Sequence, residues 1–233
     1  MLVVIAIIAV LAGIISIAVT GFQRDARVEA ANNKARISYT GFQNVLLQCE
    51  INQDIDLFNI RKITNPSSTD KPTYCVVAFE LDNGTISGDE YTLSTMYGAA
   101  ATSADSNRAV RKGGSGVSDE EKKAYKKFET FVRSNFSQDF TGAIAFYIDL
   151  EDYLVDSAVY CETSSGLVTS INSAASGGAG YMKSLIYDAG DSAKGKVFTT
   201  FNDIAAQKKM YKVTGIVCGA YPLVSETAGS TGI

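Results

Sequence analysis

Histidine is absent from this 233-residue sequence. Its absence removes the commonest general base of enzymes and excludes nucleophilic sites of the Ser-His-Asp and Cys-His kinds. The four cysteines include no Cys-x-x-Cys pair, so a structural zinc site with the usual ligands is not expected either. We therefore expect a protein that is not an enzyme and that needs no cofactor and no metal.

Motifs for nucleotides and for calcium are missing as well. The run Gly113-Gly114-Ser115-Gly116 does not have the Walker spacing, and no Asp-x-Asp-x-Asp-Gly loop occurs. We expect residues 98–117 to form an exposed loop instead. The net charge of −4 provides no overall basic field, so nucleic acid is not an expected partner.

Charge is absent from residues 1–23, and the first 19 residues are almost entirely apolar. As a helix at about 1.5 Å per residue they would extend about 28 Å, close to the thickness of the hydrocarbon core of a bilayer. The alternative is a secretory signal peptide. A basic n-region is missing, however, and the apolar stretch exceeds the usual length of roughly 7–15 residues. We expect a retained anchor.

A second helical pattern follows the apolar stretch without a break. Apolar residues recur at steps of three and four along Val28, Ala31, Ala35, Tyr39, Phe42, Val45, Leu46 and Cys49, with charged and amide residues between them. The pattern predicts one helix of about 50 residues, far longer than an ordinary globular helix. Residues 1–20 would form its hydrophobic half and residues 21–56 its amphipathic half.

The order of residues in MLVVIAIIAVLAGI resembles the N-terminal signature of type IV pilins and their pseudopilin relatives, Gly-Phe-Thr-Leu-Ile-Glu-Met-Leu-Val-Val-Ile-Ala-Ile-Ile. Met1 falls directly after the glutamate of that signature. The match covers about the first 25 residues, and beyond them the resemblance is architectural. The leader glycine, the N-methylated aromatic residue and the glutamate would precede Met1, so we expect the natural protein to begin upstream, and no prepilin-peptidase site is assigned here.

The resemblance implies an α+β, pilin-like fold, in which the long helix packs on a β-rich globular head at residues 57–233. It implies a structural subunit of a type IV pilus-like extracellular filament, a helical homopolymer with roles in adhesion, motility or DNA uptake. The implied partners are further copies of the chain, prepilin peptidase, a platform protein and an assembly ATPase. The subunit would reside in the cytoplasmic membrane before assembly.

Other functions stay open at this stage. The chain resembles a minor pilin or a type II secretion pseudopilin as much as a major pilin. It also fits a membrane-anchored binding module that does not polymerise. A signal-anchored enzyme is disfavoured by the missing histidine and catalytic motifs.

The resemblance also assigns residues to assembly. The filament core would contain the apolar residues Leu2, Val3, Val4, Ile5, Ile7, Ile8, Val10, Leu11, Ile14, Ile15 and Ile17. Ile17 stands where many family members have a helix-breaking proline. Gly13 and Gly21 bracket a segment where the helix would melt on assembly, although glycine weakens a helix by only about 1 kcal/mol, against about 3 for proline.

The head is predicted from local patterns. We expect residues 57–72 to form a connecting loop and Tyr74–Leu81 a strand. We expect a turn at Asn83-Gly84 and an interrupted return strand near 85–96. Ser118 and Glu121 form a capping box for an inserted helix near 119–136, whose lysines we read as a solvated face. Residues 143–150 and 153–162 form a hairpin about Glu151-Asp152, with further strands expected at 167–171, 196–201 and 210–220.

The sequence permits two kinds of covalent modification. Four cysteines permit two disulfides in three pairings, from Cys49, Cys75, Cys161 and Cys218, although a buried free thiol is an equally ordinary occupant of a strand. Asn83 meets the glycosylation sequon in an accessible turn, whereas the sequon at Asn135 falls on a helix.

Overall fold

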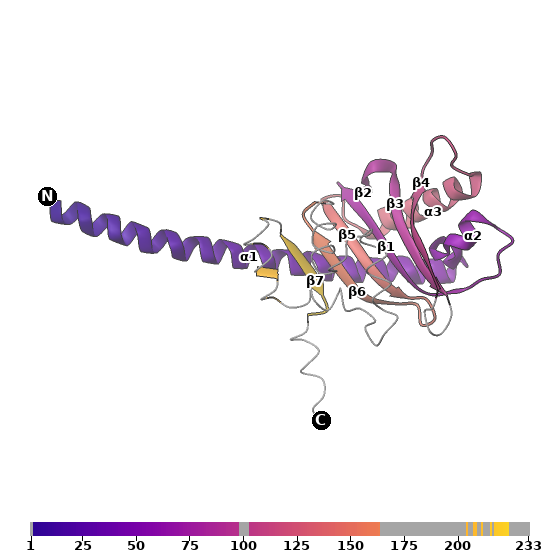
Figure 1. Ribbon diagram of the computed structural model, residues 1–233, viewed down its shortest axis with the longest axis horizontal. Coiled ribbons are helices and arrows are strands. Elements are labelled where there is room, and N and C mark those ends of the chain that lie inside the picture. The colour runs from indigo at the N-terminus through magenta and orange to yellow at the C-terminus, as the bar shows by residue number, and fades with distance from the viewer. Residues whose placement is uncertain are drawn as a thin grey trace, which may run out of the picture.

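One long helix and an antiparallel sheet make up the fold, which is α+β as expected (Figure 1). The computed structural model describes residues 2–97, 103–163, 204, 207–208, 211, 215 and 217–223, and the side chains of residues 2–18, 96 and 103–107 lie outside that description. The strands expected at 167–171 and 196–201 also lie outside it. Of the strand expected at 210–220, the described part is β7 (Cys218–Tyr221).

Helix α1 (Leu2–Ile51) is continuous over 50 residues. In Figure 1 its N-terminal part projects away from the sheet, and its C-terminal part lies along the sheet. The predicted end at residue 56 is wrong, because Gln53 has a φ of 59° and leaves the helical conformation. The Asp54 amide donates to the Cys49 carbonyl at 2.7 Å and the Gln53 amide to the Glu50 carbonyl at 3.0 Å, which closes the helix as a Schellman motif.

The expected loop at 57–72 is wrong in part, because it contains ordered helical turns. A 3-10 helix, η1 (Ile55–Phe58), leads into α2 (Ile60–Thr64). The side chain of Asn59 caps α2 by accepting from the Lys62 amide, and Phe58 is fully buried. These turns are stabilised by burial in the core, which residue-by-residue turn signals do not report.

The sheet is antiparallel, and its described strands run in the order β4-β3-β1-β5-β6-β7. The strands are β1 (Pro72–Asp82), β3 (Glu90–Tyr97), β4 (Ser103–Arg111), β5 (Gly142–Asp149), β6 (Leu154–Cys161) and β7, with the short β2 (Thr85–Ile86) paired to β1. Asn83 and Gly84 have φ values of 51° and 72°, which confirms the predicted turn. A 3-10 turn, η2 (Ser87–Asp89), interrupts the return strand as expected.

Strand β4 corrects another prediction. Residues 98–117 were expected to form a loop, yet Ser103–Arg111 pairs with β3. The sequence of β4 is polar and lacks the apolar alternation typical of a strand, so its pairing depends on the neighbouring strand. Only the glycine-rich residues that follow Arg111 match the expected loop within the described part of 98–117.

Helix α3 (Asp119–Asn135) confirms the inserted helix. The Ser118 hydroxyl accepts from the Glu121 amide at 3.1 Å, as the capping box predicts. The other half of the predicted capping box, in which the Glu121 carboxylate bonds back to the backbone amide of Ser118, is wrong. The carboxylate contacts β4 instead. It lies 3.0 Å from Arg108 Nη2 and accepts from the Arg111 amide at 3.0 Å, so the buried carboxylate ties α3 to the edge strand.

The core lies between α1, α3 and the sheet, and aromatic rings fill its centre. The Phe42 ring of α1 stacks on Phe146 with 4.1 Å between ring centroids, and it also meets Phe58, Phe79 and Phe128. Val28, Ala31, Ala35, Val45, Leu46 and Cys49 are buried on the same side of α1. The predicted apolar stripe is therefore the side of α1 that packs on the head.

Candidate assembly surface

The opposite side of α1 carries a stripe of exposed, uncharged residues. We call it the outer stripe; its members recur at steps of three and four and therefore share one side of the helix. Phe22, Ile37 and Ile51 are its most exposed large side chains, at 76%, 61% and 80%. The full stripe comprises Val19, Phe22, Ala26, Ala30, Asn33, Ile37, Thr40, Asn44, Leu47 and Ile51.

Large apolar side chains exposed in a row are unusual on a monomer, whereas single ones are normal. Charged residues border the stripe on both sides: Arg27 and Lys34 on one, and Glu29, three residues after Ala26 and four before Asn33, on the other. The apolar stripe predicted from the sequence is only the buried side of this helix. The signal that would have found the outer stripe is a second series of uncharged residues, offset from the buried one by about half a helical turn.

Strand β7 holds α1 near the point where the helix leaves the sheet. Asn32 of α1 is buried and makes a reciprocal pair of 2.9 Å hydrogen bonds with the side-chain amide of Gln207. The side-chain oxygen of Asn32, Oδ1, also accepts from the backbone amide of Ala220 at 2.8 Å. A Cβ atom on Gly219 would lie 2.2 Å from the Ala31 carbonyl carbon, so only glycine permits this close approach.

Two further polar contacts join residues 208 and 211 to α1, closer to the N-terminus of the helix. Lys208 Nζ lies 3.0 Å from Asp25 Oδ2, and its hydrogen bond lowers the pKa of that carboxyl. Arg27 donates to the Tyr211 hydroxyl at 3.2 Å. These contacts involve residues near the C-terminus, which sequence reasoning did not connect with α1.

The cysteines divide into one disulfide and two free thiols. Cys161 and Cys218 face each other across β6 and β7 and are bonded. Cys49 and Cys75 are buried and free, so the second disulfide among the predicted pairings does not form. Burial raises the pKa of Cys49 to about 12 and the pKa of Cys75 well above its ordinary value of 9.0.

The predicted filament-core residues from Leu2 to Ile17 all belong to α1, but their side chains lie outside the described residues. The helix passes through Gly13 and Gly21 without interruption, and melting there on assembly stays a prediction. No helix in the described part of the chain has the length and apolar character needed to cross a membrane.

The two glycosylation sequons differ in accessibility. Asn83 is exposed in its turn, as predicted, and its glycosylation stays a prediction. The Asn135 amide donates to Gln48 Oε1 at 3.0 Å and to the Phe131 carbonyl at 2.8 Å. The side chain of Asn135 is therefore engaged in holding α3 to α1.

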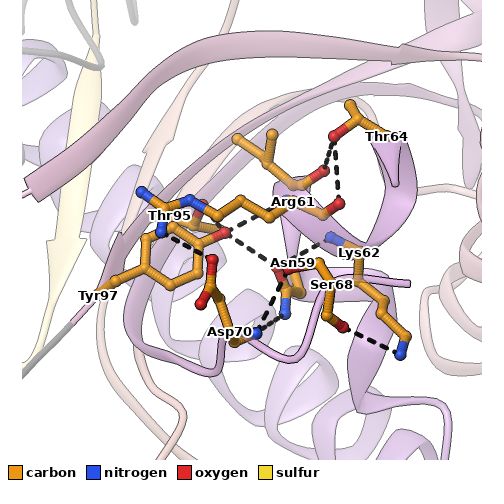
Figure 2. Close-up of polar contacts among 9 residues, drawn as sticks. Asn59, Arg61, Lys62, Thr64, Ser68, Asp70, Thr95 and Tyr97 are labelled. Carbon is orange, nitrogen blue, oxygen red and sulfur yellow. Dashed lines mark hydrogen bonds and ion pairs between the residues drawn. The ribbon is translucent and has the colours of Figure 1, made fainter. Parts of the chain in front are cut away.

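A polar network joins α2 to strand β3 (Figure 2). The Tyr97 hydroxyl donates to Asn59 Oδ1 at 2.9 Å and accepts from Thr95 Oγ1 and from the Arg61 amide. The Arg61 guanidinium lies 3.9 Å from the centre of the Tyr97 ring and pairs with Asp70 at 3.0 Å. These partners lie within the fold, so we interpret the network as structural.

Neither a metal nor a small ligand has an evident site among the described residues. They contain no group of three or more cysteine, aspartate or glutamate side chains placed to hold a metal ion. An open groove of about 270 Å³ lies between α2, α3 and residues 53–57, which follow α1. Lysines and carboxylates are mixed along it, including the ion pair between Lys127 and Asp54, so it favours no single class of ligand.

No family model, curated protein or solved structure matches this chain.

Proposed function

We propose that this chain is a structural subunit of a type IV pilus-like extracellular filament and has a pilin-like fold. The observation that carries the proposal is the arrangement of α1. Its N-terminal part projects from the sheet, and the part that packs on the head keeps an uncharged, partly apolar stripe exposed on its outer side. One helix thus offers a surface for other copies along most of its length.

Apolar burial supplies the physical support for polymerisation. Completely burying a valine, leucine, isoleucine or phenylalanine side chain stabilises a contact by about 1.5–3 kcal/mol. Val19, Phe22, Ile37, Leu47 and Ile51 gain part of this stabilisation only when another surface covers the outer stripe. The sequence of residues 1–17 extends the apolar character toward the N-terminus and suits either lipid or neighbouring helices.

In this proposal the subunit resides in the cytoplasmic membrane before assembly and then enters the filament. Prepilin peptidase, a platform protein and an assembly ATPase would process and assemble it, as the pilin resemblance implies. A minor pilin or pseudopilin would use the same helix in the same way. A membrane-anchored binding module that does not polymerise would have no use for the outer stripe.

Shearing the cells that make the protein tests the proposal. We expect the sheared fraction to contain the chain in long filaments visible by electron microscopy. The variant Ile37→Asp, which places a charge in the outer stripe, should remove the filaments. Ile204→Asp changes an exposed isoleucine outside α1 and should leave them. Retention of wild-type monomers in the membrane would contradict the proposal and favour the anchored binding module.

A further inference from the structure

The outer stripe of α1 lies between two elements of the head. On one side Gln48 accepts from Asn135 of α3 at 3.0 Å, and Gly41 approaches the Asn135 carbonyl. On the other side Gln43 donates to the Tyr153 carbonyl at 2.8 Å and accepts from the Val155 amide at 2.8 Å. Helix α3 and the β5–β6 hairpin therefore flank the stripe.

The two flanks carry opposite charge. After its first turn α3 exposes five cations, with the half-buried Glu129 as its only anion. They are Lys122, Lys123, Lys126, Lys127 and Arg133. The hairpin carries Asp149, Glu151, Asp152 and Asp156, and the sequence has no lysine or arginine between Arg133 and Lys183. The net charge of −4 for the whole chain thus conceals a separation of charge across α1.

Several of these charges make no ion pair with the described residues. Lys127 pairs with Asp54, and Lys122 with Asp119. In the described part of the chain, by contrast, Lys123, Lys126 and Arg133 make no ion pair, and Glu151 and Asp152 make none on the other flank. Leu154, half exposed at 50%, adds an apolar contact to the hairpin.

We infer that the cationic face of α3 in one copy docks against the β5–β6 hairpin of a second copy whose α1 runs parallel to the first. The inference rests on the proposed function for its partner and names the contact between heads. Parallel helices with adjacent outer stripes bring the cationic flank of each copy to the acidic flank of the other. An antiparallel pair with facing stripes would bring like charges together, which is unfavourable.

The contact explains how the heads contribute direction to assembly. Apolar stripes pack in either orientation, since the hydrophobic effect is not directional. Two different patches that meet head to tail generate an open helical polymer when the rotation does not close. Charge on the flanks therefore selects the parallel arrangement that a filament with one polarity requires.

Charge reversal tests the contact in sheared filaments from cells. Lys123→Glu with Lys126→Glu reverses the charge at two positions of α3 that make no ion pair with the described residues, and Glu151→Lys with Asp152→Lys does the same at two positions of the hairpin. Each pair should lower filament yield about tenfold, since two exposed ion pairs contribute roughly 0.2–1 kcal/mol each and reversal adds repulsion. All four changes in one chain again place opposite charges at these facing positions and should restore the yield. Failure of the fourfold variant, with a wild-type melting temperature, overturns the inference.

Cysteine cross-linking gives a second readout. A chain with Lys126→Cys and Asp152→Cys should form a ladder of covalent oligomers when its filaments are oxidised, and Lys126→Cys alone should stop at dimers or monomers. If the wild type forms no filaments, the proposed function is contradicted, but that result does not test the contact between heads. Oxidation of the full-length double-cysteine chain in detergent then decides the contact: oligomers linked through 126 and 152 support it, and monomers overturn it. Intact filaments without a ladder also overturn it.

Discussion

At the scale of single residues, the two sides of α1 should respond differently to the same substitution. Phe42 is fully buried among aromatic rings, so Phe42→Asp places a charge in an apolar site and should cost several kcal/mol of unfolding free energy. Ile37 is 61% exposed, and Ile37→Asp should change the melting temperature little while it prevents assembly. Thermal unfolding of both variants in detergent measures the difference, and equal losses of stability would contradict the orientation of α1.

The buried thiols make a prediction about reactivity. Cys49 and Cys75 are protected in the fold, so the native protein at neutral pH should expose no thiol to an aromatic disulfide reagent. Denaturation should expose two thiols, and denaturation after reduction all four cysteines. Rapid modification of the native chain would contradict the burial of both residues.

The same burial sets a pH dependence. Because the folded pKa of Cys49 is raised from 9.0 to about 12, its contribution to stability is complete below pH 9 and is lost as the pH rises toward 12. The raised pKa values of Cys75 and Tyr91 act in the same direction. Denaturant midpoints should therefore fall between pH 9 and 12. The denaturant midpoint of Cys49→Ala should fall less steeply with pH than that of the wild type. An identical slope would contradict the raised pKa of Cys49.

At the scale of elements, the contact between β7 and α1 depends on a missing side chain. Gly219→Ala would push a Cβ atom against the Ala31 and Asn32 backbone, which is not flexible enough to make room. We expect destabilisation of about 1–3 kcal/mol, typical of overpacking. Amide exchange should also become faster around residue 32.

Gly113 offers a matched control for this prediction. A Cβ atom there meets nothing within 4 Å, so Gly113→Ala should leave stability and exchange unchanged. Equal behaviour of the two alanine variants would mean that β7 does not press on α1 as the structure describes.

At the scale of the whole molecule, the filament should combine two kinds of contact. Apolar contacts along α1 are insensitive to salt, whereas the charged flanks are screened when 1 M salt reduces the Debye length to about 3 Å. High salt should loosen the heads but leave filaments intact, and a detergent that solvates apolar helices should dissociate them. Sedimentation of sheared filaments in each condition measures this.

Ile7→Lys distinguishes the apolar helix from the heads. The substitution places a charge within the first stretch, at a cost of about 2.5–3.5 kcal/mol at the centre of a membrane helix. We expect assembly to fail even where the variant still reaches the membrane. Filaments that dissolve in salt, together with normal assembly of Ile7→Lys, would mean that the heads polymerise by themselves.

Much of the local structure could be predicted because its signals are short-range. The continuity of α1, the Ser118 cap of α3 and the turn at Asn83-Gly84 depend on residues only a few positions apart. The side of α1 that packs on the head followed from helical periodicity in the same way. The local signal failed for the carboxylate of Glu121, because strand β4 supplies other partners for it.

Periodicity in the sequence alone determined the long helix, and residue order carried the resemblance that implies the α+β class and suggests a filament. Tertiary structure decided the partners that lie far apart along the chain. Cys161 bonds Cys218 at a separation of 57 residues, and Asn32 pairs with Gln207 at a separation of 175. It also decided that opposite charges flank an uncharged stripe, since no periodic pattern records which elements come to lie beside α1.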